Sequence, residues 1–373
     1  HIPEMTIFQK RGIFVRFYAV IITVFAVFLI VLPLLWQTPA PPVVQEEETA
    51  PQKENTEEVK TDEAAAQWVQ PLLPEETPSP AAALPTVEEP LDTGFRILDE
   101  STGVIHEISV QDYVRGAVCS EMPSTFHTEA LKAQAVSAHT YALNLKKQQA
   151  QNPNPSLQGA DFKADPSNWR GYVTEEQARE RFGSQFGQHW EKICTAVDAV
   201  YNQLLLYEDE PIAAAYHAIS NGTTEGSENV WGRPLRYLQP VRSDGDLLAP
   251  GHEKQQIYTA EEMQKTILSA FPQAVLGEDP GEWLIITQRS PSGYVTAMEI
   301  GGVPVTGLEF RSALGLRSSD FTAEQNGGVF TVTTAGYGHG VGLSQYGADY
   351  MARQGSSYQE ILAHYYQGSQ LVQ

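Results

Sequence analysis

The stretch SVQDYVRGAVCSEMPSTFHTEALKAQAVSAHTYALNLKK (109–147) decides the fold around it, because it predicts two consecutive helices joined by a short turn. Its opening serine, followed three residues later by Asp112, is typical of a helix N-terminus. Pro123 cannot continue the helix, so we expect the first helix to cover 110–122. The second helix is expected over 127–147, where recurring alanines allow a neighbouring element to approach closely.

One acidic residue of the first helix falls on its apolar side. Helical steps of three and four residues place Glu121 on the same face as Val114, Ala117 and Val118. Burial and the negative end of the helix dipole both disfavour an ionised carboxylate, so we expect a raised pKa for Glu121. Such a carboxyl group suits a general acid. The alternatives are a partly exposed glutamate at a helix end, or one paired with a base such as Lys132.

An apolar stretch near the N-terminus, FYAVIITVFAVFLIVLPLLW (17–36), carries no charge. Its twenty residues, at 1.5 Å of helical rise each, cover the ~30 Å hydrocarbon layer of a membrane. Basic residues precede it whereas 37–52 has none, so the positive-inside rule places 1–16 in the cytoplasm. We expect a retained single-pass anchor in the cell membrane rather than a cleaved signal peptide, whose apolar core would be shorter.

Residues 37–94 contain thirteen acidic side chains and two lysines, which gives −11 of the formal net charge of −22. A Pro-rich segment of this kind buries too little apolar surface to offset its conformational entropy, so we expect a disordered linker. A chain this acidic repels phosphate backbones, which argues against nucleic acid as a partner.

Residues 95–373 have a globular composition, and we expect one extracytoplasmic domain of the α+β class. The sequence FRILDESTGVIHEIS (95–109) predicts two short strands around a turn, and strands predominate over 283–334. Further helices are expected over 174–182, 185–203, 260–270 and 343–367. In this arrangement the helical segment with Glu121 packs on a mainly antiparallel, β-rich portion. Cys119 and Cys194 are expected to be free thiols.

Three long stretches of this domain follow one another in an order found in a known family. They are VRGAVCSEMPSTFHTEALKAQAVSAHTYALN (114–144), AAYHAISNGTTEGSENVWGRPLRYLQPVRSDGD (214–246) and AGYGHGVGLSQYGADYMA (335–352). Together with EFRSALGLRSSDF (309–321) they resemble the stage II sporulation protein D family, membrane-anchored lytic transglycosylases of the cell wall. The glutamate of that family's Glu-Met-Pro motif is catalytic, so the resemblance implies that Glu121 is the catalytic residue.

The resemblance implies cleavage of the MurNAc–GlcNAc bond in glycan strands without stem peptides, during septal wall remodelling and engulfment in sporulation. One carboxyl group serves twice in this reaction, because the substrate's C6 hydroxyl is the nucleophile that closes a 1,6-anhydro ring. An ordinary two-carboxylate hydrolase stays an alternative, since the sequence does not place five other acids relative to Glu121: Asp112, Glu129, Glu225, Glu228 and Asp244. We expect no organic cofactor. Some members bind zinc through cysteines, but the paired cysteines are missing here, so no metal is expected either.

Two polar stretches are candidates for the walls of a glycan-binding groove. The candidates in 214–246 are His217, Ser220, Asn221, Glu228, Trp231 and Asp244, and those in 335–352 are His339, Ser344, Gln345 and Tyr346. The glycines around His339 let the backbone approach its neighbours, but no Lys-Ser/Thr follows them, so a phosphate loop is excluded. The alternatives are a packed Trp231 in a capped turn and an internal His339 in a structural one.

Lys132 and His139 lie seven residues apart on the second expected helix, so they share a face that could meet Glu121. Most relatives have arginine where His139 stands and glycine where Asn221 stands, so the groove of this chain departs from the family's usual pattern.

The resemblance also implies partners, namely peptidoglycan strands, a cell-wall amidase and a membrane partner of the engulfment machinery. The competing hypothesis is a non-catalytic, wall-binding protein that enhances an amidase, since the family includes such members. The two differ in whether Glu121 is needed for turnover.

Overall fold

The structure of the protein is a computed structural model, in which residues 94–373 are described. The expected anchor (17–36) and all of the expected linker except Gly94 lie outside the described residues. Within the described part of the chain, no helix is both long and apolar enough to cross a membrane.

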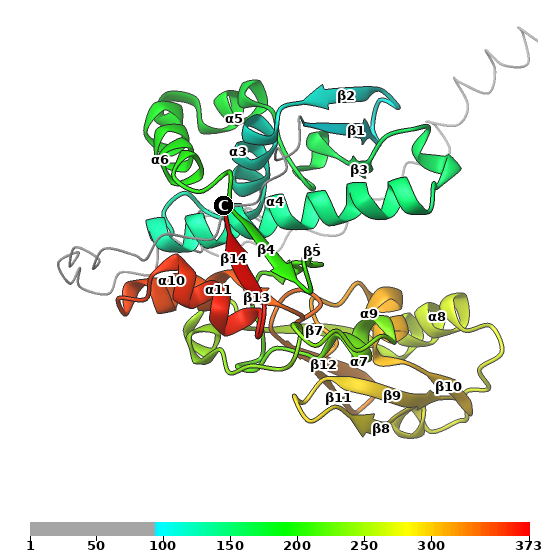
Figure 1. Ribbon diagram of the computed structural model, residues 1–373. Helices are drawn as coiled ribbons and strands as arrows, with labels where there is room; N and C mark the ends of the chain where they lie inside the picture. The colour runs from blue at the N-terminus through cyan, green and yellow to red at the C-terminus, as the bar shows by residue number, and fades with distance from the viewer. Residues whose placement is uncertain (1–93) are drawn as a thin grey trace, which may run out of the picture. The chain divides into compact units, whose positions relative to one another are not determined.

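The described region is α+β, with several mainly antiparallel sheets (Figure 1). Its helices are α3 (Val110–Glu121), α4 (Thr128–Gln151), α5 (Glu175–Phe182), α6 (Phe186–Asp198), α7 (Ser227–Trp231), α8 (Ala260–Ala270), α9 (Gly307–Leu314), α10 (Gln345–Arg353) and α11 (Tyr358–Tyr365). Its strands are β1 (Phe95–Asp99), β2 (Ile105–Ile108), β3 (Phe162–Ala164), β4 (Leu204–Tyr207), β5 (Glu210–Pro211), β6 (Tyr216–His217), β7 (Glu253–Thr259), β8 (Leu284–Arg289), β9 (Val295–Ile300), β10 (Val303–Val305), β11 (Phe321–Asn326), β12 (Val329–Ala335), β13 (Leu343–Ser344) and β14 (Gln370–Val372). The sheet orders are β2-β1-β3, β14-β4-β5, β13-β6, β10-β9-β8 and β11-β12-β7.

Helix α3 begins at the predicted residue and ends one residue before the predicted end. The Ser109 hydroxyl accepts a hydrogen bond from the Asp112 amide at 3.1 Å and donates one to the Asp112 carboxylate at 2.7 Å, which caps the helix. Met122 precedes Pro123 and is extended, with φ −121° and ψ 140°, so the helix stops at Glu121.

The long helix α4 is the centre of the larger core, where it packs against α3, α6, α10 and α11. The small sheet β2-β1-β3 adds a layer of aromatic rings, because Phe95 lies 4.9 Å from Tyr113 and 5.5 Å from Phe162. Phe162 belongs to β3, a three-residue strand that pairs in parallel with β1. Three residues show too little alternation to be recognised as a strand from sequence.

Residues 253–335 form an inserted lobe with a hydrophobic core of its own (lower right in Figure 1). It contains α8, α9 and the two antiparallel sheets β10-β9-β8 and β11-β12-β7. Its two ends meet, since Glu253 pairs with Ala335 and the Gly336 amide donates to the His252 carbonyl at 2.8 Å. The expected packing of α3 on a β-rich portion therefore holds only for the small sheet, because most antiparallel strands belong to this lobe.

Candidate functional site

Glu121, the last residue of α3, is partly exposed, and its carboxyl group contacts the start of α10. The amide Nε2 of Gln345 donates a hydrogen bond to Glu121 Oε2 at 3.3 Å. Burial raises the pKa of Glu121, and this hydrogen bond offsets part of the shift because it favours the ionised form. The raised pKa confirms the sequence prediction. A carboxyl group in this state can both release and accept a proton.

Two phenols lie near this carboxyl group, those of Tyr113 and Tyr216. Burial and the negative charge of Glu121 both raise the pKa values of the Tyr113 and Tyr216 phenols, which stay neutral. The ring of Tyr141, on α4, lies 6.4 Å from that of Tyr216. Tyr113 and Tyr216 therefore lie within electrostatic range of the Glu121 carboxyl group.

Two histidines predicted for the groove lie side by side next to Tyr216. The ring centroids of His217 and His339 are 5.8 Å apart. The peptide group of Val341 contacts both, since its carbonyl accepts from His217 Nδ1 at 3.2 Å and its amide donates to His339 Nδ1 at 3.1 Å. Burial and the neighbouring His339, with a smaller effect of Arg311, lower the pKa of His217 to about 3, whereas burial and the positive charge of Arg311 lower the pKa of His339 to about 4. Both rings are therefore uncharged at neutral pH.

The glycines beside His339 are required by close packing, as the sequence predicts. Gly342 has φ +76°, and a Cβ atom there would lie 2.0 Å from the Ala215 carbonyl oxygen. A Cβ atom at Gly338 would lie 2.7 Å from the His217 side chain. The absent side chains allow this segment to lie directly against β6 and to bring His339 next to His217.

Two further residues interact with the histidine pair, Trp231 and Arg311. Trp231 is 45% exposed, and its ring centroid lies 5.7 Å from that of His339, so it is not packed in the core. Arg311 belongs to α9 of the inserted lobe and acts electrostatically on both histidines. The sequence reasoning gave Arg311 no role, although it lies within a stretch that resembles the family.

Ser220 and Ser344 hold a buried aspartate that the sequence reasoning did not single out. The Ser344 hydroxyl donates to Asp246 Oδ1 at 2.6 Å, and the Ser220 amide donates to Asp246 Oδ2 at 2.9 Å. Asp246 is fully buried, and burial raises its pKa to about 6. Ser344 also caps α10, whose first residue is Gln345, so Asp246 fixes the helix start that supports Glu121.

Three other predicted residues make their contacts outside the inserted lobe: Lys132, His139 and Tyr346. Lys132 Nζ lies 2.6 Å from a Glu129 carboxylate oxygen and 5.6 Å from the centre of the Tyr358 ring. His139 is fully buried, with its ring 6.3 Å from Phe95. The Tyr346 ring packs edge-on at 4.9 Å against Phe126, which follows the turn after Glu121.

The remaining predicted residues lie further along the surface. Asn221 lies outside the inserted lobe and binds to it. Its side-chain amide donates hydrogen bonds of 2.7 Å to the Ser292 carbonyl and 2.7 Å to the Asp320 carboxylate. Glu228 is exposed on α7, and Asp244 is exposed and paired with Arg242. The structure thus brings Gln345 to Glu121, Glu121 near Tyr216, and His217 and Trp231 to His339.

None of the other acids left open by the sequence shows a contact with Glu121 among residues 94–373. Asp112 pairs with Arg115, and Glu129 pairs with Lys132. Glu225 is buried and accepts hydrogen bonds from the Gly226 amide and from Ser290. Within the same residues no cluster of His, Cys, Asp and Glu could hold a metal ion, and no disulfide joins Cys119 to Cys194.

The sequence of this chain is similar to those of several known proteins. A family model described as stage II sporulation protein matches residues 99–207. The chain is 36% identical to stage II sporulation protein D of Bacillus amyloliquefaciens over 77% of this chain and 80% of that protein. It is 35% identical to stage II sporulation protein D of Bacillus subtilis (strain 168), over 72% and 75% respectively. A more distant relative, the amidase enhancer of Bacillus subtilis (strain 168), is 26% identical over 69% of this chain and 40% of that protein. Because the likeness to the first two covers most of each protein, the chain belongs to the stage II sporulation protein D family.

Proposed function

We propose that the protein is a peptidoglycan lytic transglycosylase with Glu121 as its acid and base. It would cleave the MurNAc–GlcNAc bond of glycan strands that lack stem peptides and leave 1,6-anhydro-MurNAc ends. The observation that supports this proposal best is the Glu121 carboxyl group, which is partly exposed, has a raised pKa and is held by Gln345.

The reaction begins with neutral Glu121. Its proton passes to the glycosidic oxygen, and the bond from that oxygen to C1 of N-acetylmuramic acid breaks. The C6 hydroxyl oxygen then bonds to C1, and its proton returns to the Glu121 carboxylate. The Gln345 amide stabilises the carboxylate between the two transfers, since its hydrogen bond favours the ionised form.

The surroundings of Glu121 suit a single-carboxylate mechanism. A hydrolase of the usual kind needs a second carboxylate facing the same bond. Asp246, near the start of α10, is fully buried and saturated by serine donors, so it has no access to substrate. The half-exposed ring of Trp231 offers a sugar a stacking surface beside His339.

Product analysis tests this proposal directly. Detergent-solubilised full-length protein, given peptide-free glycan, should release products that end in an anhydro sugar and are lighter by one water than hydrolysis products. Glu121→Gln should abolish release, whereas Glu107→Gln, a change at an exposed glutamate on β2, should leave it intact. Reducing-end products alone would reassign the enzyme as a hydrolase.

The relationship to an amidase enhancer favours a second candidate function, a wall-binding protein that stimulates an amidase. This candidate predicts that Glu121→Gln leaves both glycan binding and amidase stimulation unchanged, and that the unaltered protein releases no glycan product. In either case we propose that 17–36 anchors the protein in the cell membrane with 95–373 outside, where peptidoglycan and a cell-wall amidase are its partners.

A further inference from the structure

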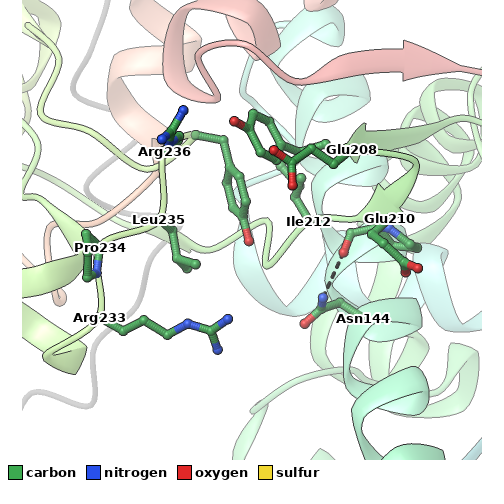
Figure 2. A pocket seen from close by; sticks show the side chains of 11 residues that line it. Asn144, Glu208, Glu210, Ile212, Arg233, Pro234, Leu235 and Arg236 are labelled. Carbon is green, nitrogen blue, oxygen red and sulfur yellow. Dashed lines mark hydrogen bonds between the residues drawn. The ribbon is translucent and has the colours of Figure 1, made fainter.

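A cavity of about 350 Å³ lies between the β4–β5 hairpin and the loop that follows α7 (Figure 2). Aromatic, amide and charged side chains line it together: Asn144, Tyr207, Glu208, Arg233, Arg236 and Tyr237. The sequence analysis assigned none of these residues a function. This mixture of ring faces and hydrogen-bonding groups is typical of a site for a polar ligand such as a sugar.

Two arginines of this cavity lack an acidic partner. Arg233 and Arg236 are exposed, and across residues 94–373 neither side chain forms an ion pair or hydrogen bond. Glu210, at the same cavity, is already paired with Lys147. Figure 2 shows the Arg233 guanidinium reaching from its loop toward Asn144. An unpaired guanidinium can bind a carboxylate through two parallel hydrogen bonds.

The walls around Arg233 are fixed before any ligand arrives. The Asn144 amide donates to the Pro211 carbonyl at 2.8 Å, and Asn144 Oδ1 accepts from Gln148 at 2.6 Å. The rings of Tyr207 and Tyr237 lie 5.5 Å apart, and the Tyr237 hydroxyl accepts from the Ala213 amide at 3.2 Å. A preformed wall binds its ligand at a smaller entropic cost.

The backbone at the rim of the cavity is strained. Glu208 and Asp209 form the two-residue tip of the β4–β5 hairpin with φ values of 53° and 62°, the left-handed conformation that a tight hairpin turn requires at both positions. Aspartate tolerates this conformation, so the cost falls on Glu208. The hairpin tip thus keeps Glu208 at the cavity at an energetic cost.

Two structural elements connect this cavity with the surroundings of Glu121. Asn144 lies three residues after Tyr141 on α4, about 5 Å further along the helix axis, and Tyr141 is the neighbour of Tyr216. Arg233 follows two residues after Trp231, whose ring contacts His339. Two residues of the cavity are thus close in sequence to aromatic side chains that neighbour Tyr216 and His339.

We infer that this cavity is a distal subsite of the glycan groove, in which Arg233 binds the lactyl carboxylate of a muramic acid residue. The inference rests on the proposed function, since it assigns the subsite to the same strand that Glu121 cleaves. When a stem peptide is attached, this carboxyl group becomes an amide and loses its charge. The Arg233 subsite then favours peptide-free strands over substituted ones.

Binding without turnover tests the inference. Full-length protein carrying Glu121→Gln is titrated by calorimetry with three probes: a peptide-free GlcNAc–MurNAc tetrasaccharide, the same tetrasaccharide with stem peptides, and uncharged chitotetraose. Arg233→Gln should weaken binding of the peptide-free tetrasaccharide about tenfold, the loss expected for a charged hydrogen bond, and leave chitotetraose unaffected. The affinity of Arg233→Lys for the peptide-free tetrasaccharide should lie between those of Arg233 and Arg233→Gln, because lysine keeps the charge but lacks the planar guanidinium.

Arg170→Gln is the matched control, because Arg170 is also exposed but does not line the cavity. Equal weakening of all three probes by Arg233→Gln, or unchanged binding of the peptide-free probe, would overturn the inference. A loss confined to the peptide-bearing probe would assign Arg233 to a stem-peptide carboxylate and overturn it as well. These titrations measure binding and not turnover. If the protein proves not to cleave glycan, they still decide whether Arg233 binds the lactyl carboxylate.

Discussion

The Gln345 side-chain amide donates a hydrogen bond to the Glu121 carboxyl group at 3.3 Å, although 224 residues separate them in sequence. This contact is the direct link from α10 to the end of α3. It favours the ionised form of a carboxyl group whose pKa is raised by burial.

Gln345→Ala should therefore raise the pKa of Glu121 further, because the donor that stabilises the anion is lost. Carbon-13 NMR titration of the glutamate side chains measures this shift, with Glu121→Gln used to assign the signal. The basic limb of the pH–rate profile should move to higher pH, and the rate should fall about tenfold. An unchanged or lowered pKa would show that the contact does not form in solution.

His217 should make the protein less stable in acid. Its pKa is about 3 in the folded protein, against about 6.5 in the unfolded chain. Between these values the unfolded chain binds a proton that the folded protein does not, so this contribution to stability is complete above about pH 6.5 and is lost as the pH falls toward 3. Urea unfolding of wild type and His217→Gln should show a free-energy difference that is constant above pH 7 and shifts in favour of the variant below pH 6. Parallel stability curves over this range would contradict the buried, neutral state of His217.

Gly342→Ala should destabilise the protein by about 3 kcal/mol or more, because both the backbone angle and the space forbid a side chain. Gly368→Ala is a matched control with the same φ of +76°, but its Cβ atom would meet only Tyr207 at an ordinary 3.9 Å. We expect about 1 kcal/mol for this control, from backbone strain alone. Thermal or urea unfolding measures both, and equal losses would mean that close packing against Ala215 contributes nothing.

Asp246→Ala should destabilise the protein and reduce activity, since it leaves the donors of Ser220 and Ser344 without an acceptor in the core. We expect a loss of about 3 kcal/mol. Asp244→Ala, two residues away at an exposed position, should change stability by less than about 0.5 kcal/mol. Measuring glycan affinity of Asp244→Ala also tests its predicted place in the groove, because an unchanged affinity would remove Asp244 from it.

Trp231→Ala should weaken glycan binding while the fold stays intact, because 45% of this residue is exposed. A lost stacking contact corresponds to about a three- to tenfold weaker affinity. Tyr201→Ala removes an aromatic ring that is 37% exposed elsewhere and should leave binding unchanged. Calorimetry in the Glu121→Gln background measures both, and equal affinities for the two variants would exclude stacking on Trp231.

Local features of the fold were predictable because local chemistry determines them. The Ser109 cap and Pro123 set the limits of α3, and α8 (Ala260–Ala270) coincides with its predicted range. The helix predicted over 185–203 ends earlier, at Asp198, because the turn toward β4 occupies the following residues. The raised pKa of Glu121 also followed from its face of the helix and its position at the helix end.

Relationships between distant parts of the chain were not predictable in this way. The sequence around Asp246 contains no signal that Ser220 and Ser344 will donate hydrogen bonds to its carboxylate. The placement of Arg311 beside the two histidines depends on how the inserted lobe packs, which no local pattern encodes. Lys132 shares the helix with His139, yet its ammonium group pairs with Glu129, one turn earlier on the same helix.

The closed ends of residues 253–335 have a consequence for how this protein can change over evolution. Because His252 and Gly336 are joined by a hydrogen bond, a short linker could replace the entire insertion without separating the strands on either side. Related proteins could carry a different module in place of the inserted lobe while the contact between Glu121 and Gln345 is kept. The residue that the module supplies at the position of Arg311 could then change without altering Glu121 or Gln345.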